Sequence, residues 1–185
     1  THVPVLLHEV LDLLAPKSGA IIIDGTLGLG GHAGALLLAG GQDARLLGID
    51  RDLSAIEQAK NNLKTKERQT LIFHATYDQM EECWRSSGWP TADVVLLDLG
   101  VSSLQLNTPE RGFSFRNDAS LDMRMDASDE VSAYDVVNNY DEARLANLIY
   151  EYGEERASRR IARAIVYRRE QRPIETTKAL ADLVA

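Results

Sequence analysis

The sequence predicts an α/β protein with a Rossmann-like, doubly wound parallel sheet, followed by an inserted all-helical domain. Short apolar runs alternate with segments of helical periodicity over the first hundred residues, which is the pattern of parallel strands joined by helical crossovers. A glycine-rich turn directly follows the first apolar run, as in folds that bind nucleotide-type cofactors. From Ser132 onward the pattern is helical only.

Local patterns predict the elements in chain order. The predicted strands are residues 20–24, 45–50, 70–74 and 93–97. The predicted helices of this part are residues 2–14, 33–39, 53–63 and 77–86. Residues 104–129 are polar and contain turn formers, so we expect a long ordered loop there. Beyond the loop we expect helices capped by Ser132 and Asp141, a third helix over 154–169, and a last one capped by Thr176 or Thr177.

These elements predict three parts. Residues 1–103 form the cofactor-binding, sheet-bearing part, residues 104–131 an active-site or substrate loop, and residues 132–185 an incomplete helical insertion that recognises the substrate. With only four strands, the last strand would be an edge next to the proposed site. We therefore expect the remaining C-terminal strands of the sheet to lie outside this chain.

Composition narrows the class of protein. The chain has 185 residues, of which 44% are hydrophobic and 26% charged, as in a globular domain. It shows no run of membrane-spanning length and no signal-peptide pattern, and its single cysteine, Cys83, excludes an internal disulfide. We expect a cytoplasmic protein with Cys83 buried as a small apolar side chain.

Charge is unevenly distributed along the chain. The net charge is -8, but residues 144–185 hold nine basic and six acidic side chains. Any nucleic acid is therefore expected to contact this later segment first.

The glycine-rich turn is the first candidate site. Asp24 ends the first predicted strand, and Gly28, Gly30 and Gly31 lie in the turn that follows. Asp50 ends the second strand, 19 residues after Gly31, a spacing that suits a carboxylate accepting hydrogen bonds from ribose hydroxyls. The alternative is that both acids only cap helices and that the glycines only permit the turn.

The turn favours S-adenosylmethionine as the cofactor. A dinucleotide fingerprint beginning at Gly28 fits in part, but this glycine lies four residues after Asp24, and the loop contains no Gly-Lys-Ser/Thr. S-adenosylmethionine carries no phosphate, and its sulfonium and ammonium charges favour nearby carboxylates. A dinucleotide-dependent oxidoreductase stays open as the alternative.

A second candidate site follows the fourth strand, in the run Asp98-Leu99-Gly100-Val101-Ser102-Ser103. The run is not the Gly-x-Ser-x-Gly elbow of a hydrolase. Asp98 is the first candidate for the group that accepts a proton during methyl transfer, with Ser102 or Ser103 behind it. The alternative is that this run only caps a helix.

Several longer motifs resemble one family in their order and residues. They are Asp24 to His32, Gly48 to Asp52, Leu97 to Leu106, Glu110 to Phe115, Leu121 to Asp126, Tyr152 to Arg156 and Arg160 to Ile165. Together they are similar to the bacterial ribosomal small-subunit RNA methyltransferase H family (MraW-like), whose members are class I methyltransferases. The resemblance implies methylation of the exocyclic N4 of a cytidine in the decoding region of 16S ribosomal RNA. It places the cofactor contacts on Gly30, Gly31, His32, Asp50, Tyr77, Asp98 and Gln105.

Candidate substrate contacts lie in the loop and in the helical part. Phe113 and Phe115 are candidates for stacking on a base, unless both are buried anchors of the loop. Four arginines recur at helical spacing and are candidates for phosphate contacts: Arg156, Arg159, Arg160 and Arg163. The alternative is a solvated face paired with Glu151, Glu154 and Glu155.

The expected partner is small-subunit ribosomal RNA or the assembling 30S particle, with no membrane and no DNA. No metal site is expected, since the four histidines show no ligand spacing. A non-catalytic RNA-binding assembly factor is the remaining alternative.

Overall fold

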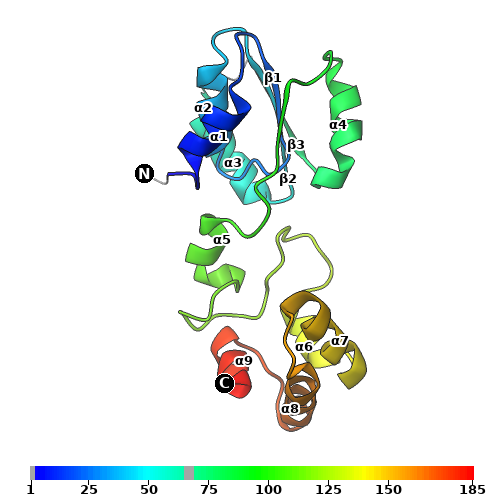
Figure 1. The fold of residues 1–185 in the computed structure, drawn as a ribbon. Coiled ribbons are helices and arrows are strands. Elements are labelled where there is room, and N and C mark those ends of the chain that lie inside the picture. The colour runs from blue at the N-terminus through cyan, green and yellow to red at the C-terminus, as the bar shows by residue number, and fades with distance from the viewer. Residues whose placement is uncertain (1–2, 65–68) are drawn as a thin grey trace. The chain divides into compact units, whose positions relative to one another are not determined.

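The computed structural model describes residues 3–64 and 69–185, which divide into two compact units. The first unit ends at Gly100 and the second runs from Val101 to Ala185 (Figure 1). The sequence places the corresponding boundary after residue 103, and its finer division at residue 131 stays a prediction. Each unit is described by itself below.

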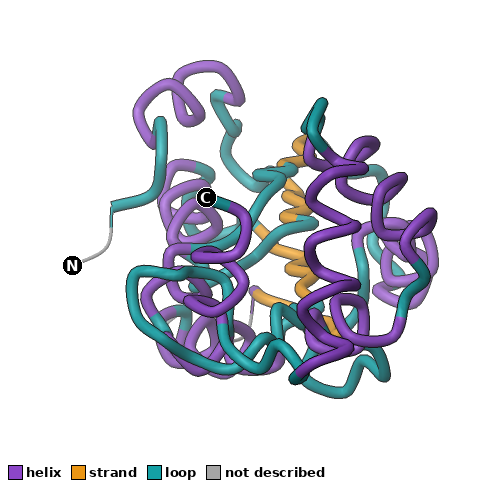
Figure 2. The backbone as a smooth tube through the Cα atoms, turned by 90° about the horizontal axis from the view of Figure 1, so that it is seen from below, coloured by secondary structure: helices purple, strands orange, loops and turns teal. Residues whose placement is uncertain are grey.

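The first unit contains a parallel sheet of four strands in the order β3-β2-β1-β4. The strands are β1 (Ile21–Asp24), β2 (Arg45–Asp50), β3 (Thr70–His74) and β4 (Val94–Leu96). The register pairs Asp24 with Gly48 of β2 and with Leu96 of β4, so the carboxyl ends of the three strands meet at one edge. Figure 2 shows the strands gathered in one layer. The predicted α/β fold with a parallel sheet is confirmed.

Helices cover both faces of this sheet, because successive strand residues point to opposite sides. Ile22 and Leu46 pack with Leu36 and Leu37 on the face covered by α1 (Leu7–Leu14), α2 (Gly31–Ala39) and α3 (Leu53–Asn62). Ile23, Leu47 and Ile49 pack with Cys83 on the face covered by α4 (Met80–Ser87). The predicted burial of Cys83 is confirmed, and burial raises the pKa of its thiol.

Three predicted helix starts in this unit are wrong, and the first is that of α2, which begins at Gly31 rather than at residue 33. Helix α1 begins at Leu7 rather than at residue 2, because Leu6 adopts the left-handed conformation with a φ of 50°. Helix α4 is preceded by a separate 3-10 turn, η2 (Tyr77–Gln79), so Tyr77 itself is not α-helical. Helix α3 begins as expected, since Asp52 accepts a hydrogen bond from the amide of Ser54.

The second unit is helical and has its own core. Its elements are α5 (Ser103–Asn107), η3 (Pro109–Arg111), α6 (Ala133–Asn139), α7 (Glu142–Gly153), α8 (Ser158–Gln171) and α9 (Thr177–Val184). Leu121 of the loop segment packs with Val137, Leu145 and Ile165 from three helices. This contact anchors the loop to the helices.

In this unit the predicted helix caps agree with the structure better than the predicted loop does. Ser132, Asp141 and Thr176 cap α6, α7 and α9. The predicted long loop over 104–129 is wrong in its first part, because α5 overlaps its start and η3 lies within it. The third helix begins at Ser158 and not at residue 154, since Glu154 adopts a left-handed φ of 51° that ends α7.

Among the described residues, no helix is both long enough and apolar enough to cross a membrane.

Candidate functional site

Asp24 is the most buried of the candidate acids. Its side chain ends β1 with 1% of its surface exposed, and Oδ1 accepts a hydrogen bond from the amide of Thr26 at 3.1 Å. Burial raises the pKa of the Asp24 carboxyl to about 6, against the opposing effects of the Thr26 amide and the charge of His32. This carboxyl is a buried acceptor at the edge of the sheet.

Thr26 links the ends of β1 and β4. The amide of Asp98 donates a hydrogen bond to Oγ1 of Thr26 at 2.7 Å, and the amide of Gly25 donates to the carbonyl of Leu96 at 3.0 Å. The backbone of Asp98 is therefore fastened to the turn that follows β1. Its side chain stays about half exposed.

Asp50 holds the glycine turn in place. Its Oδ2 accepts from the amide of Gly28 at 2.7 Å, and its Oδ1 accepts from the amide of Asp52 at 2.8 Å. Asp50 therefore has a structural role, but not the one that the alternative gave it, because the cap of α3 is Asp52. An ionised carboxylate has about four lone-pair sites, so each oxygen retains capacity for a ligand hydroxyl.

The turn itself requires glycine at two positions. Gly28 and Gly30 have φ values of 52° and 77°, in the left-handed region that glycine adopts without strain. Gly30 directly precedes α2, whose first amides lack partners within the helix. A turn of this kind brings backbone donors close to a ligand.

His32 joins three segments of the first unit. Its Nε2 lies 2.8 Å from the carbonyl of Val5, and its Nδ1 lies 3.8 Å from Oδ2 of Asp98. Because a carbonyl only accepts, Nε2 donates to it, and Nδ1 is the ring nitrogen that faces the carboxylate. Next to it, Pro4 packs so closely on Gly31 that a Cβ there would lie 2.6 Å from its Cγ.

Tyr77 lies beside the same turn. Its Cβ is 3.4 Å from the position that a Cβ on Gly25 would occupy, and half of its surface is exposed. The first unit therefore brings together eight predicted cofactor residues at one edge of the sheet: Asp24, Gly28, Gly30, Gly31, His32, Asp50, Tyr77 and Asp98.

The side chains and backbone groups at this edge of the sheet fit a cofactor of the S-adenosylmethionine type. Three carboxylates end or follow neighbouring strands, which favours a ligand with positive charges over one with phosphates. Because Gly28 and Gly30 have no side chains, their backbone atoms are not covered by a Cβ and can approach a ligand closely.

Ser102, Ser103 and Gln105 lie in the second unit, at the start of α5. Oγ of Ser102 accepts from the amide of Gln105 at 3.2 Å, and Oε1 of Gln105 accepts from the amide of Ser102 at 2.9 Å. The helix-cap alternative therefore describes Ser102. A catalytic role for Ser102 or Ser103 and a cofactor contact for Gln105, which is buried, stay predictions.

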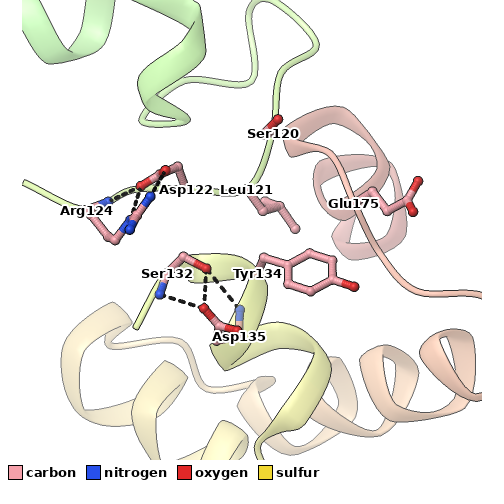
Figure 3. A pocket seen from close by; sticks show the side chains of 8 residues that line it. All are labelled: Ser120, Leu121, Asp122, Arg124, Ser132, Tyr134, Asp135 and Glu175. Atoms are coloured by element: carbon pink, nitrogen blue, oxygen red, sulfur yellow. Dashed lines mark hydrogen bonds and ion pairs between the residues drawn. The ribbon is translucent and has the colours of Figure 1, made fainter. Parts of the chain in front are cut away.

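One of the resembling motifs, the Leu121 to Asp126 run, lines a polar pocket in the second unit together with residues outside the motifs, a feature that sequence reasoning did not assign. Its volume is about 590 Å³, and it is lined by Ser120, Leu121, Asp122, Arg124, Ser132, Tyr134, Asp135 and Glu175 (Figure 3). Arg124 donates to both oxygens of Asp122, at 2.9 and 2.7 Å, and this guanidinium lowers the pKa of the Asp122 carboxyl. In the sequence, the charged residues Asp122, Arg124 and Asp126 alternate with methionines, and this alternation is the signal that could have indicated the pocket.

The two candidate stacking residues differ in exposure. Phe113 is half-buried, with the guanidinium of Arg111 at 6.0 Å from its ring centroid. Phe115 is 71% exposed. The buried-anchor alternative is therefore wrong for Phe115, which stays the better candidate for a base contact.

The candidate arginines are exposed, but they do not all belong to one helix. Arg159, Arg160 and Arg163 lie on α8, whereas Arg156 lies in the turn before it, because α8 begins only at Ser158. Arg163 pairs with Glu142 through Nε at 3.7 Å, rather than with the three predicted glutamates. Their contact with phosphate stays a prediction.

No group of three or more His, Cys, Asp or Glu side chains is placed to hold a metal ion within residues 3–64 and 69–185.

Comparison with known proteins identifies the family of the chain. The model of one family, described as the MraW methylase family, matches residues 1–185. The chain belongs to this family. A methylase requires a methyl donor, so membership bears out the expectation of S-adenosylmethionine as cofactor and favours methyl transfer over hydride transfer.

Relatives of the MraW methylase family match the chain along its whole length. The "Ribosomal RNA small subunit methyltransferase H" of Parafrankia sp. (strain EAN1pec) is 48% identical over 187 residues, covering 100% of this chain and 57% of the relative. The protein of the same name from Caldicellulosiruptor saccharolyticus is 47% identical, covering 99% of this chain and 59% of the relative. The chain thus spans less than two thirds of the length of these relatives.

Solved structures show a weaker likeness. The C-terminal domain of precorrin-6Y C5,15-methyltransferase from Rhodobacter capsulatus covers 54% of this chain and 50% of that chain, with a TM-score of 0.43 and 22% identity.

Proposed function

We propose that the protein containing this chain is an S-adenosylmethionine-dependent methyltransferase that modifies the exocyclic N4 of a cytidine in the decoding region of 16S ribosomal RNA. The substrate is the RNA itself or the assembling 30S particle, and the protein acts in the cytoplasm. The main support is the family match over residues 1–185, together with relatives whose names specify small-subunit ribosomal RNA.

The first unit supports the cofactor part of this proposal. Asp50 is proposed to accept from the ribose hydroxyls while it keeps the Gly28 turn in place. Gly30, Gly31 and Tyr77 are proposed to border the rest of the ligand, and the resemblance adds Gln105 to the proposed cofactor contacts. When bound, S-adenosylmethionine supplies a methyl group on a positively charged sulfur.

Asp98 is proposed to act on the attacking nitrogen. The lone pair of a cytosine amino group is delocalised into the ring, so the nitrogen is a weak nucleophile. A carboxylate that accepts a hydrogen bond from this amino group orients it, and the same carboxylate takes the surplus proton once the new N–C bond has formed. The side chain of Asp98 is exposed enough for this contact, and His32 stands beside it.

The substrate side of the proposal relies on the second unit. Phe115 is proposed to stack on the target base or its neighbour, with Phe113 as the second candidate. Arg156, Arg159, Arg160 and Arg163 are proposed to contact phosphates. A catalytic role for Ser102 and Ser103 is part of the same proposal.

The test is a methyl-transfer assay with the complete protein, radiolabelled cofactor and unmodified small subunits, followed by mapping of the labelled nucleotide. We expect label on N4 of one cytidine. Asp98→Asn should lower the rate by about 10²- to 10⁴-fold, the range for loss of a general base. Asp50→Asn should instead weaken binding of S-adenosylhomocysteine, measured by calorimetry.

Two outcomes would contradict the proposal. Label on another base, or on a ring carbon, would refute the N4-cytosine assignment. RNA binding without any methyl transfer, by a protein that still binds S-adenosylhomocysteine, would favour a non-catalytic assembly factor.

A further inference from the structure

Helix α8 has one face in the core and one face in solvent. Ser158, Ala162 and Ile165 are buried, and the last two pack in the core of the second unit. The exposed positions include Arg159, Arg160, Arg163 and Tyr167. At 3.6 residues per turn these four side chains fall within a sector of about 100° around the helix axis. They therefore form one continuous strip, which we call the Arg–Tyr strip.

The strip is suited to a negatively charged partner. It lies in the segment of residues 144–185, in which basic side chains outnumber acidic ones although the whole chain carries a net charge of -8. The ion pair between Arg163 and Glu142 is long, at 3.7 Å, and the Arg163 side chain is mostly exposed. Such a surface pair contributes little, so the guanidinium is readily available to a phosphate.

Tyr167 distinguishes this strip from a merely solvated, charged face. Its side chain is 66% exposed, so most of its ring contributes nothing to the core. An aromatic ring placed one turn beyond an arginine, on the same face, offers a stacking surface next to a phosphate contact. Proteins that bind single-stranded nucleic acid combine these two elements.

We propose that the Arg–Tyr strip binds an unpaired stretch of RNA, with arginines on successive phosphates and Tyr167 stacked on a base. This inference rests on the proposed function only in taking RNA as the substrate. Unpaired RNA is favoured over a duplex because the bases of a duplex are stacked on one another and do not present a face to a side chain. The strip is thus a second contact with the substrate, beyond the residues that serve methyl transfer.

The experiment compares two probes and two tyrosines. Binding of the complete protein to a fluorescent single-stranded RNA of mixed sequence, and to a blunt duplex of the same length, is measured by anisotropy. Tyr167→Ala should weaken binding of the single strand by about 5- to 150-fold, the equivalent of about 1–3 kcal/mol for one stacked base. Tyr167→Phe should retain it, since the ring remains. Affinity for the duplex should not change.

Tyr150 provides the matched control. It is 61% exposed, much like Tyr167, but lies on α7 outside the strip. Tyr150→Ala should bind both probes as the unaltered protein does. Arg159→Gln combined with Arg163→Gln should reduce the slope of log affinity against log salt by about 0.7 for each lost phosphate contact on a single strand.

The results separate this inference from the proposed function. An unchanged affinity of Tyr167→Ala, an equal loss in Tyr150→Ala, or an equal loss on the duplex would overturn the stacking role of Tyr167. Binding of S-adenosylhomocysteine should be the same in all these variants. If the unaltered protein transfers no methyl group but Tyr167→Ala still weakens binding of the single strand, the proposed function fails and this inference stands.

Discussion

Asp24 should make the stability of the first unit fall as the pH rises. Burial raises the pKa of this carboxyl from its ordinary value of 3.8 to about 6 in the folded protein. Between these two values the folded state binds more protons than the unfolded chain, in which Asp24 is already ionised. The free energy of unfolding therefore decreases with pH over this window, and the loss is complete about one pH unit above the folded-state pKa.

The size of the effect follows from the same two values. A pKa that rises from 3.8 to about 6 corresponds to about 3 kcal/mol between the acidic and neutral limits. Asn has nearly the same shape as Asp, does not ionise, and can still accept from the amide of Thr26. The stability of Asp24→Asn relative to the unaltered protein should therefore rise by about 2–3 kcal/mol from pH 4 to pH 7.5.

The assay is urea denaturation at several pH values, followed by tryptophan fluorescence. Trp84 and Trp89 are the only tryptophans of the chain, and both pack against the core of the first unit. Glu57→Gln, at an exposed position of α3, controls for the general effect of removing a carboxylate. If Asp24→Asn and the unaltered protein give parallel curves, the buried carboxyl does not titrate as reasoned.

Two pairs of glycines give further predictions. Gly31→Ala should loosen the N-terminal segment, because the new Cβ would lie 2.6 Å from Cγ of Pro4, whereas Gly34→Ala meets ordinary contact at 3.4 Å and should leave that segment unchanged. Amide hydrogen exchange of Val3, Val5 and Leu6 tests the pair, and equal exchange in both variants would contradict the packing argument. Gly112→Ala should destabilise the second unit by about 1–3 kcal/mol, since its φ is 71° and its Cβ would lie 2.6 Å from a backbone oxygen. Gly153→Ala, which meets nothing within 4 Å, should not destabilise it, and comparable losses in chemical denaturation would refute the difference.

The sheet was predictable because each strand combines a short apolar run with a polar or glycine stop. Ile22 and Ile23 pack on opposite faces, so both must be apolar, and the continuous run reveals a strand buried on both sides. Helix α5 entered only through the alternative that the Asp98 to Ser103 run caps a helix, because five residues are too few to establish a period. Its Ser102-x-x-Gln105 capping box was the visible signal. The late start of α8 depends on the left-handed backbone of Glu154, which no side-chain pattern reveals.

The acids of the site could be located from the sequence, but their separate roles could not. Their order along the chain shows that Asp24, Asp50 and Asp98 reach one edge of a parallel sheet, yet hydrogen bonds to distant backbone atoms distinguish them. Asp24 is buried, and the oxygens of Asp50 accept from two backbone amides. Asp98 is held through its own amide instead, which leaves its half-exposed carboxylate beside Nδ1 of His32. Of these three acids, Asp98 is the one whose carboxylate makes no hydrogen bond that shapes the turn, which is why we propose it, and not Asp24 or Asp50, as the group that meets a substrate amino group.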